Sequence, residues 1–236
     1  MGFIARHRPS RATIAVFGCL SLSAIAIPSS RVAGQTAPAS SPQLVGIYDG
    51  GQMEMGVGLR LQPNGRFDYM LAYGALDESA SGRWTSDHDT VYLTSDPVTP
   101  PRFTLLGQQP ASDGKMHLIL DLPRGWTRQY LDAEIGLADG RVAGGQLSDD
   151  SDVIQLAPND KPVSLRVRLD VYDIASDSFH LNGSAASILH VRFDPNDLGK
   201  VAFAKTPLHI TGKTLTFERY GRSIVFKPTD QKWETE

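Results

Sequence analysis

The side chains best suited to chemistry lie between residues 54 and 84 of this 236-residue chain. They combine carboxylates with aromatic and basic groups: Glu54, Tyr69, Tyr73, Asp77, Glu78, Arg83 and Trp84. Asp77 and Glu78 could serve as an acid–base or cation-binding pair, because such work needs two carboxyls at a defined separation in a partly dry site. Adjacent residues of an extended chain point to opposite faces, however, so these two are poorly placed to act on one substrate. The pattern favours a solvated turn over a hydrolase, and we expect no enzymatic activity.

A binding role fits the same stretch better. Tyr69, Leu71 and Tyr73 alternate along one strand face, and if that face points into a barrel they line its cavity with apolar bodies and polar tips. Trp84 lies two residues after Gly82, a spacing typical of a tryptophan that plugs the core at the closed end of a barrel. A contact with a ligand is the alternative role for this side chain. The predicted ligand-binding residues are Glu54, Tyr69, Leu71, Tyr73, Asp77, Glu78 and Trp84.

The sequence lacks the residue patterns that other kinds of site require, and we expect neither a metal nor a cofactor. The histidines after residue 40 (His88, His117, His180, His190 and His209) form no local ligand pair. Asp149 to Asp152 offers oxygen ligands without the glycine and closing glutamate of an EF-hand loop. Neither a Gly-x-Ser-x-Gly elbow, nor a phosphate-binding loop, nor a dinucleotide fingerprint is present.

The amino-acid composition excludes several classes of protein. Hydrophobic residues make up 41% of the chain, enough to build a core, and its formal charge of −3 argues against nucleic-acid binding. Glycine and proline together number 22 + 15 = 37, which disfavours long helices. A single cysteine excludes a disulfide framework.

The first forty residues have the order of a secretory signal. Arg6, Arg8 and Arg11 precede an apolar run from Ala12 to Ile27, which is shorter than the roughly 20 residues that a spanning helix needs. We therefore expect residues 1–40 to be a signal peptide and leader, and the protein to be periplasmic or secreted. Val16 to Cys19 resembles a bacterial lipobox, but Phe17 is bulky for that motif and the apolar run continues past it. An uncleaved signal peptide that anchors the chain and lipidation of Cys19 are the less favoured alternatives, and no other membrane attachment is expected.

Beyond residue 40 the hydrophobic pattern is that of strands. Short alternating runs recur, each closed by Gly, Pro, Asn or Asp, and the longest runs from Val163 to Tyr172. The stretch 188–228 is too small to fold alone, and the first group of strands is too few to close a barrel. We therefore predict an all-β chain with a barrel-like domain from residues 41–112 plus 187–230 and an inserted β-sandwich at 113–186. Two consecutive domains are the alternative.

Three motifs resemble known families. Leu44 to Tyr48, Gly58 to Tyr69 and Gly82 to Trp84 resemble the opening meander of lipocalin-like envelope proteins of the NlpE type, which implies an antiparallel lipocalin-like barrel. The metal-associated CxxC of NlpE-type proteins is absent, so the resemblance implies no metal site here. Tyr73 to Glu78 ahead of Gly82 to Trp84 also resembles a signature of uncharacterised exported proteins of Gram-negative bacteria, which implies no activity. Asp132 to Val142 is similar to the hairpins of Ig-like or prealbumin-like sandwiches.

Together these features predict an exported, non-enzymatic envelope protein. Its barrel is expected to hold a small apolar ligand, in a cavity with few convergent polar groups. The alternative is a structural or protein-interaction module of the envelope, with a filled barrel, an exposed apolar patch and free sheet edges offered to a partner.

Overall fold

The computed structural model describes residues 41–233, which form an all-β protein. The predicted signal peptide and leader, with Cys19, lie outside the described residues. No helix within 41–233 is long and apolar enough to cross a membrane. Two short 3-10 turns occur, η1 (Pro42–Leu44) and η2 (Asp170–Tyr172).

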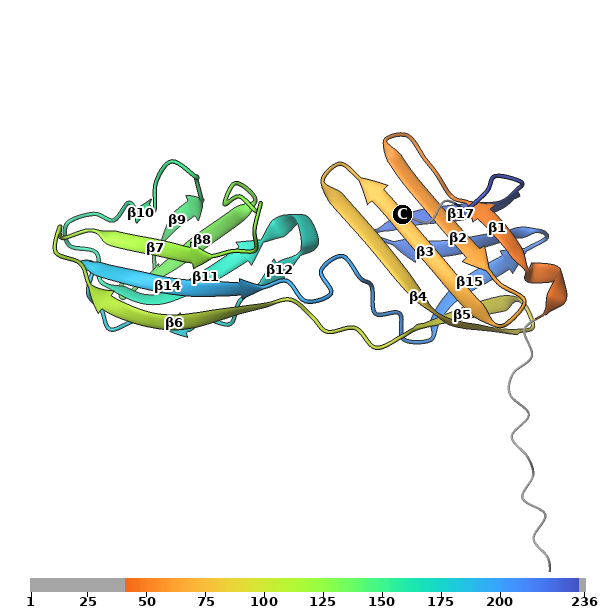
Figure 1. Ribbon diagram of the computed structural model, residues 1–236, viewed down its shortest axis with the longest axis horizontal. Helices are drawn as coiled ribbons and strands as arrows, with labels where there is room; N and C mark the ends of the chain where they lie inside the picture. The colour runs from red at the N-terminus through yellow and green to blue at the C-terminus, as the bar shows by residue number, and fades with distance from the viewer. Residues whose placement is uncertain (1–40, 234–236) are drawn as a thin grey trace, which may run out of the picture. The chain divides into compact units, whose positions relative to one another are not determined.

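Eight strands close into an antiparallel barrel, as the sequence predicted. In spatial order they run β1-β17-β16-β15-β5-β4-β3-β2, so the first five and the last three strands of the chain share one sheet (Figure 1). Their bounds are β1 Gly46–Asp49, β2 Met55–Leu61, β3 Arg66–Tyr73, β4 Leu76–Asp87, β5 Thr90–Ser95, β15 Thr206–Thr211, β16 Thr214–Arg219 and β17 Arg222–Thr229. Strands β2, β3 and β4 alternate more buried and less buried residues along most of their length, because only one face of a barrel wall meets the core.

Local turn chemistry sets the β2–β3 hairpin of the barrel. Asn64 and Gly65 connect β2 to β3, Gly65 has a φ of 76°, and the Asn64 side chain accepts a hydrogen bond from the backbone N–H of Arg66. Further along, Gly82 faces inward on β4. A Cβ there would lie 2.1 Å from the carbonyl oxygen of Thr94, so only glycine allows β4 and β5 to approach this closely.

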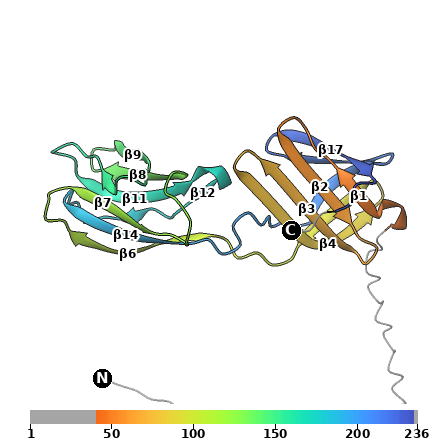
Figure 2. The ribbon, with the colours of Figure 1, turned by 45° about the horizontal axis from the view of Figure 1, so that its top comes forward.

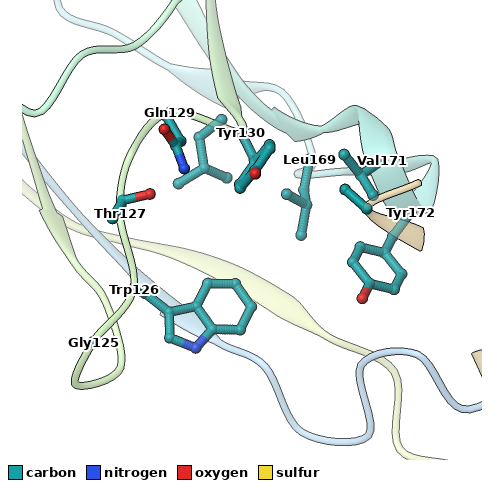
Figure 3. Close-up of a pocket in the computed structure, with 10 residues that line it drawn as sticks. Gly125, Trp126, Thr127, Gln129, Tyr130, Leu169, Val171 and Tyr172 are labelled. Carbon is teal, nitrogen blue, oxygen red and sulfur yellow. The ribbon is translucent and has the colours of Figure 1, made fainter. Parts of the chain in front are cut away.

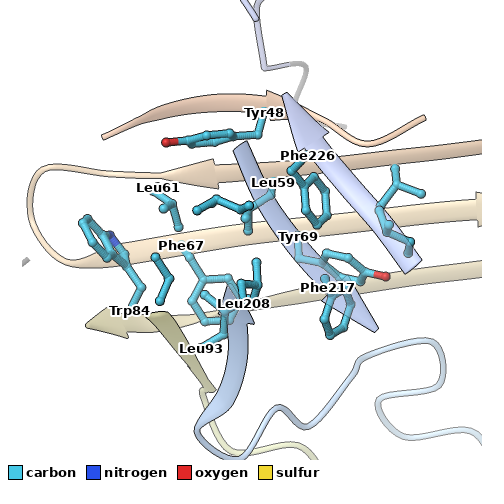
Figure 4. Packing of buried hydrophobic residues seen from close by; sticks show 14 of the residues in the cluster. Tyr48, Leu59, Leu61, Phe67, Tyr69, Trp84, Leu93, Leu208, Phe217 and Phe226 are labelled. Atoms are coloured by element: carbon cyan, nitrogen blue, oxygen red, sulfur yellow. The ribbon is translucent and has the colours of Figure 1, made fainter. Parts of the chain in front are cut away.

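Aromatic rings fill the barrel interior (Figure 4). The ring of Tyr69 lies 5.2 Å from that of Phe203 and 6.1 Å from that of Phe217, and both contacts are edge-to-face. Phe67, Trp84 and Phe226 belong to the same buried cluster. The barrel is therefore a packed core along much of its axis.

The remaining strands form a second module of two sheets around its own apolar cluster (Figure 2). One sheet has the order β10-β7-β14-β6, and the other has the order β12-β11-β8-β9 with β13 beside β11. The bounds are β6 Arg102–Pro110, β7 Met116–Asp121, β8 Leu131–Leu137, β9 Val142–Gln146, β10 Val153–Ile154, β11 Pro162–Leu169, β12 Ile174–Ala175, β13 Phe179–His180 and β14 Ser187–Asp194.

The boundaries of this inserted module differ from the predicted ones. The prediction gave residues 102–112 and 187–194 to the barrel, but β6 and β14 pair with each other, and β14 also pairs with β7, outside the barrel. Their inward side chains Phe103, Leu189 and Phe193 belong to the second cluster. The module therefore runs from about β6 to β14 and interrupts the barrel between β5 and β15.

Candidate functional site

The two ends of the barrel differ in chemistry. At one end Trp84 is buried, its indole Nε1 donates to the carbonyl oxygen of Gln62 at 3.0 Å, and its backbone N–H donates to Gly65. The β2–β3 turn thus lies beside the indole, and Trp84 occupies the position of a core plug rather than one that a ligand could reach.

Polar groups gather at the opposite end, which we call the mouth. It is the end of the β1–β2, β3–β4 and β16–β17 connections. Glu78 pairs with Leu71 across β3 and β4, so both point inward, while Asp77 is exposed on the outer face. Asp77 and Glu78 therefore lie on opposite faces of one strand, as their adjacency predicted, and they cannot act as a pair.

Arg219, the last residue of β16, also points inward and binds Glu78. Its Nε lies 2.9 Å from Oε2 and its Nη2 lies 2.5 Å from Oε1, with 7% of the Glu78 side chain and 21% of the Arg219 side chain exposed. The Tyr220 hydroxyl donates to Oε1 of the same carboxylate. Burial alone would lower the pKa of Arg219, but bonding to Glu78 raises it above its usual value. Burial and the bond to Glu78 raise the pKa of Tyr220 to about 12.

The Tyr69 hydroxyl lies in the interior near this cluster. Only 2% of Tyr69 is exposed, and its hydroxyl has no hydrogen-bond partner within the described part of the chain. In Figure 4 its ring points away from the Trp84 end. Burial, and then the charge of Glu78, raises the pKa of Tyr69, so the phenol stays protonated at neutral pH. A buried hydroxyl without a partner is an uncommon cost that a bound group could relieve.

A pocket of about 500 Å³ opens at the mouth. Its lining residues are Met55, Leu71, Tyr73, Leu76, Asp170, Val171, Tyr172, Asp173, Arg219, Tyr220, Arg222 and Ile224. The guanidinium of Arg222 lies 5.7 Å from the centre of the Tyr73 ring. The barrel side of the pocket thus combines aliphatic and tyrosine side chains with two arginines, Arg219 and Arg222, and Asp170 and Asp173 line it from the second module.

The predicted binding residues divide into two groups at this point. Leu71 and Tyr73 line the pocket, and Tyr69 and Glu78 lie buried nearby. Glu54 is exposed in the β1–β2 turn at the mouth end with a φ of 63°, Asp77 faces outward, and Trp84 lies at the far end, and none of these three lines the mouth pocket.

Sequence reasoning missed Arg219, Tyr220 and Arg222. The signal was present, because Leu215, Phe217 and Arg219 alternate on the inward face of one strand, and an arginine that continues an apolar alternation needs a buried partner. That partner is Glu78, 141 residues earlier in the chain.

Another pocket, of about 350 Å³ and rich in aromatic side chains, is lined by the second module except for Ala75 of the β3–β4 turn (Figure 3). Its lining residues are Ala75, Gly125, Trp126, Thr127, Gln129, Tyr130, Leu131, Leu169, Val171 and Tyr172. Half of them belong to the connection between β7 and β8, which we call the aromatic loop (residues 122–130).

A third cluster surrounds His117 on β7. Its Nδ1 lies 3.2 Å from Oδ1 of Asp152, and its Nε2 lies 3.0 Å from Oδ2 of Asp113. Hydrogen bonds to Asp152 and Asp113 raise the pKa of His117. Hydrogen bonds from the backbone N–H of Lys115 and from His117 lower the pKa of Asp113. Because each ring nitrogen faces a carboxylate, the doubly protonated ring fits this position best.

We expect this cluster to make the stability of the second module depend on pH. The raised pKa of His117 adds stability that is fully present below the unfolded value of about 6.5 and is lost as pH rises through the folded value. The lowered pKa of Asp113 adds stability above its unfolded value of about 3.9, which is lost as pH falls through its folded value. The contribution is therefore largest between these two unfolded values. Comparing the free energy of unfolding of the parent and His117→Gln from pH 4 to 9 should show a difference that shrinks as pH rises, and a constant difference would contradict it.

Within residues 41–233, no three His, Cys, Asp or Glu side chains are placed to hold a metal ion. No protein-family model, no curated protein and no solved structure matches this chain.

Proposed function

We propose that this chain is an exported, non-enzymatic protein whose lipocalin-like barrel binds a small apolar ligand at its mouth. The observation that carries the proposal is the mouth pocket. Its volume of about 500 Å³ falls in the range of about 300–1,000 Å³ typical of ligand sites, and Met55, Leu71, Leu76 and Ile224 give it apolar walls.

The barrel architecture supports this proposal. Consecutive strands β1 to β5 and β15 to β17 are neighbours in the sheet, and β17 closes on β1, which is the up-and-down order of ligand-binding barrels of eight strands. The interior below the mouth is filled by aromatic rings, so the ligand is expected to rest above Tyr69 rather than to run down the axis.

The carboxylates of the mouth support binding without chemistry. Glu78 already accepts hydrogen bonds from Arg219 and Tyr220, and Asp77 points away from the pocket. A general acid or base must instead be within reach of a substrate and free to exchange a proton. Export is supported by the basic and apolar order of residues 1–27.

Binding of a neutral apolar dye, 1-N-phenylnaphthylamine, to the mature chain tests whether the mouth pocket is a binding site. Tyr73→Ala removes an aromatic wall of the pocket and should weaken binding about tenfold. Tyr92→Ala is a matched control, because Tyr92 lies on the barrel wall away from the mouth pocket with Lys205 5.2 Å from its ring centre, much as Arg222 lies near Tyr73. Equal effects of the two substitutions would contradict the mouth as the site.

Native mass spectrometry of protein purified from its own host provides the companion measurement. An adduct that leaves on denaturation should be present in the parent and reduced in Tyr73→Ala. The denatured mass of the same sample also reports signal cleavage and lipidation of Cys19.

A protein-interaction role is the second candidate, and the sheet edges of the second module favour it. Strand β9 pairs only with β8 and β6 only with β14 among the described strands, and Val142 at the start of β9 is 67% exposed. Unpaired strand edges can accept an extended segment of another protein. Co-purification of one protein in place of a small adduct, abolished by Val142→Pro, would favour this role over ligand binding.

A further inference from the structure

We infer that the second module carries a binding site of its own, for a neutral saccharide, in the pocket formed by its aromatic loop. The inference does not rest on the proposal for the barrel mouth, since only Val171 and Tyr172 line both pockets. It rests on the chemistry of the lining, on the support behind the aromatic rings, and on the way the loop is held.

The lining selects for an uncharged ligand with both apolar and hydroxyl surfaces. Three aromatic rings face the pocket, from Trp126, Tyr130 and Tyr172, and none of the ten lining residues carries a charge (Figure 3). A charged ligand would lose water here without gaining a partner of opposite charge. A sugar ring instead presents C–H faces that pack on aromatic rings and hydroxyl groups at its edge.

The lining also has neutral polar side chains that can hydrogen-bond to the hydroxyl groups of a sugar. The Thr127 hydroxyl and the Gln129 side-chain amide line the pocket, and neither makes a hydrogen bond to another described residue. An amide can both donate and accept, and a hydroxyl can do the same, which matches the mixed donors and acceptors of a saccharide. A purely apolar ligand would bury these groups unpaired, which disfavours it.

The principal ring is backed by a rigid stack. The Trp126 ring lies 5.4 Å from that of Phe193, which in turn stacks on Phe103 at 4.6 Å. Trp126 nevertheless remains partly exposed, and so does Tyr130. A large aromatic ring fixed from behind and left open to solvent is a ready platform for a ligand.

Hydrogen bonds hold the loop in shape before any ligand arrives. Arg128 donates through its side chain to the carbonyl oxygens of Leu118 and Ser151, each at 3.1 Å, and its backbone N–H donates to Asp149. The side chain of Gln146 donates to the carbonyl oxygen of Gln129 at 2.6 Å. Such preorganisation lowers the entropic cost of binding.

A glycan array that carries neutral and charged saccharides, probed with the mature chain, tests the inference. We expect binding to neutral glycans, and calorimetric titration of the best one should show a roughly tenfold or greater loss of affinity for Trp126→Ala. Trp233→Ala is the matched control, because that indole lies near Arg60 at the C-terminal end of the chain, far from this loop in sequence, and should leave affinity unchanged. Gln129→Ala and Tyr130→Ala repeat the test with side chains that do not support Phe193.

Each outcome decides the matter. Failure of every neutral glycan to bind, preference for charged glycans, or equal affinities of the parent and the Gln129→Ala and Tyr130→Ala variants would overturn the inference. Tyr73→Ala should leave saccharide binding intact, so failure of the mouth proposal and failure of this one can be told apart.

Discussion

Replacing Glu78 by alanine is expected to destabilise the barrel by about 3–5 kcal/mol, because it leaves a largely buried arginine without its partner. Glu78 binds Arg219 through both carboxylate oxygens and also accepts the Tyr220 hydroxyl. Removing it leaves Arg219 with only the Tyr220 hydroxyl as an acceptor among the described residues, near the Tyr69 hydroxyl, which already has no partner there. The cost therefore comes mainly from the groups left behind.

Two variants separate this cause from a simple loss of side-chain volume. Asp77→Ala alters the exposed neighbour on the outer face and should change stability by no more than about 0.5 kcal/mol. The double variant Glu78→Leu with Arg219→Met removes both charges and should recover much of the loss, since replacing a buried pair by apolar groups is often nearly neutral.

Denaturant unfolding of the mature chain measures these differences. With Trp126 and Trp233 replaced by phenylalanine in every variant, the fluorescence of Trp84 reports the barrel alone. A Glu78→Ala variant as stable as Asp77→Ala, or a double variant less stable than Glu78→Ala, would contradict the ion-pair account.

The Glu78–Arg219 pair also shows where sequence reasoning succeeds and where it stops. Alternation along β4 is local, so the opposite orientations of Asp77 and Glu78 follow from an extended backbone alone. The partner of Glu78 depends on closure of the barrel, which brings β16 from the far end of the chain. Nothing in a local pattern encodes that closure, so Arg219 could be suspected of having a partner, but the partner could not be named.

The sequence-based boundaries of the inserted module are wrong for the same reason, because they too depend on long-range strand pairing. Strand β14 alternates as well as the barrel strands do and β6 has only a weak pattern, so the apolar side chains of both strands would suit either core. Which sheet a strand joins is decided by long-range pairing and register, here between Phe103 and Phe193. The turn at Asn64 and Gly65, by contrast, is a short-range feature that two residues specify.

Trp84→Ala should have an effect as large as that of Glu78→Ala, again on stability. Truncating a buried tryptophan costs about 3–5 kcal/mol, and the carbonyl oxygen of Gln62 loses its indole donor as well. Far-UV circular dichroism during denaturant unfolding measures the loss, with Trp233→Ala as a control whose indole makes a cation–π contact with Arg60 and should cost far less.

This substitution also separates the two roles that a tryptophan after Gly82 could have. A core plug at the closed end lowers stability when removed but leaves dye binding at the mouth unchanged under conditions where the barrel is folded. Removing a ligand contact would instead leave stability unchanged and weaken dye binding. Because Trp84 hydrogen-bonds to the first and last residues of the β2–β3 turn, Gln62 and Gly65, and points into the same cluster as Phe67, we expect the first pattern. Unchanged stability together with weakened dye binding would show instead that the closed end opens to a ligand.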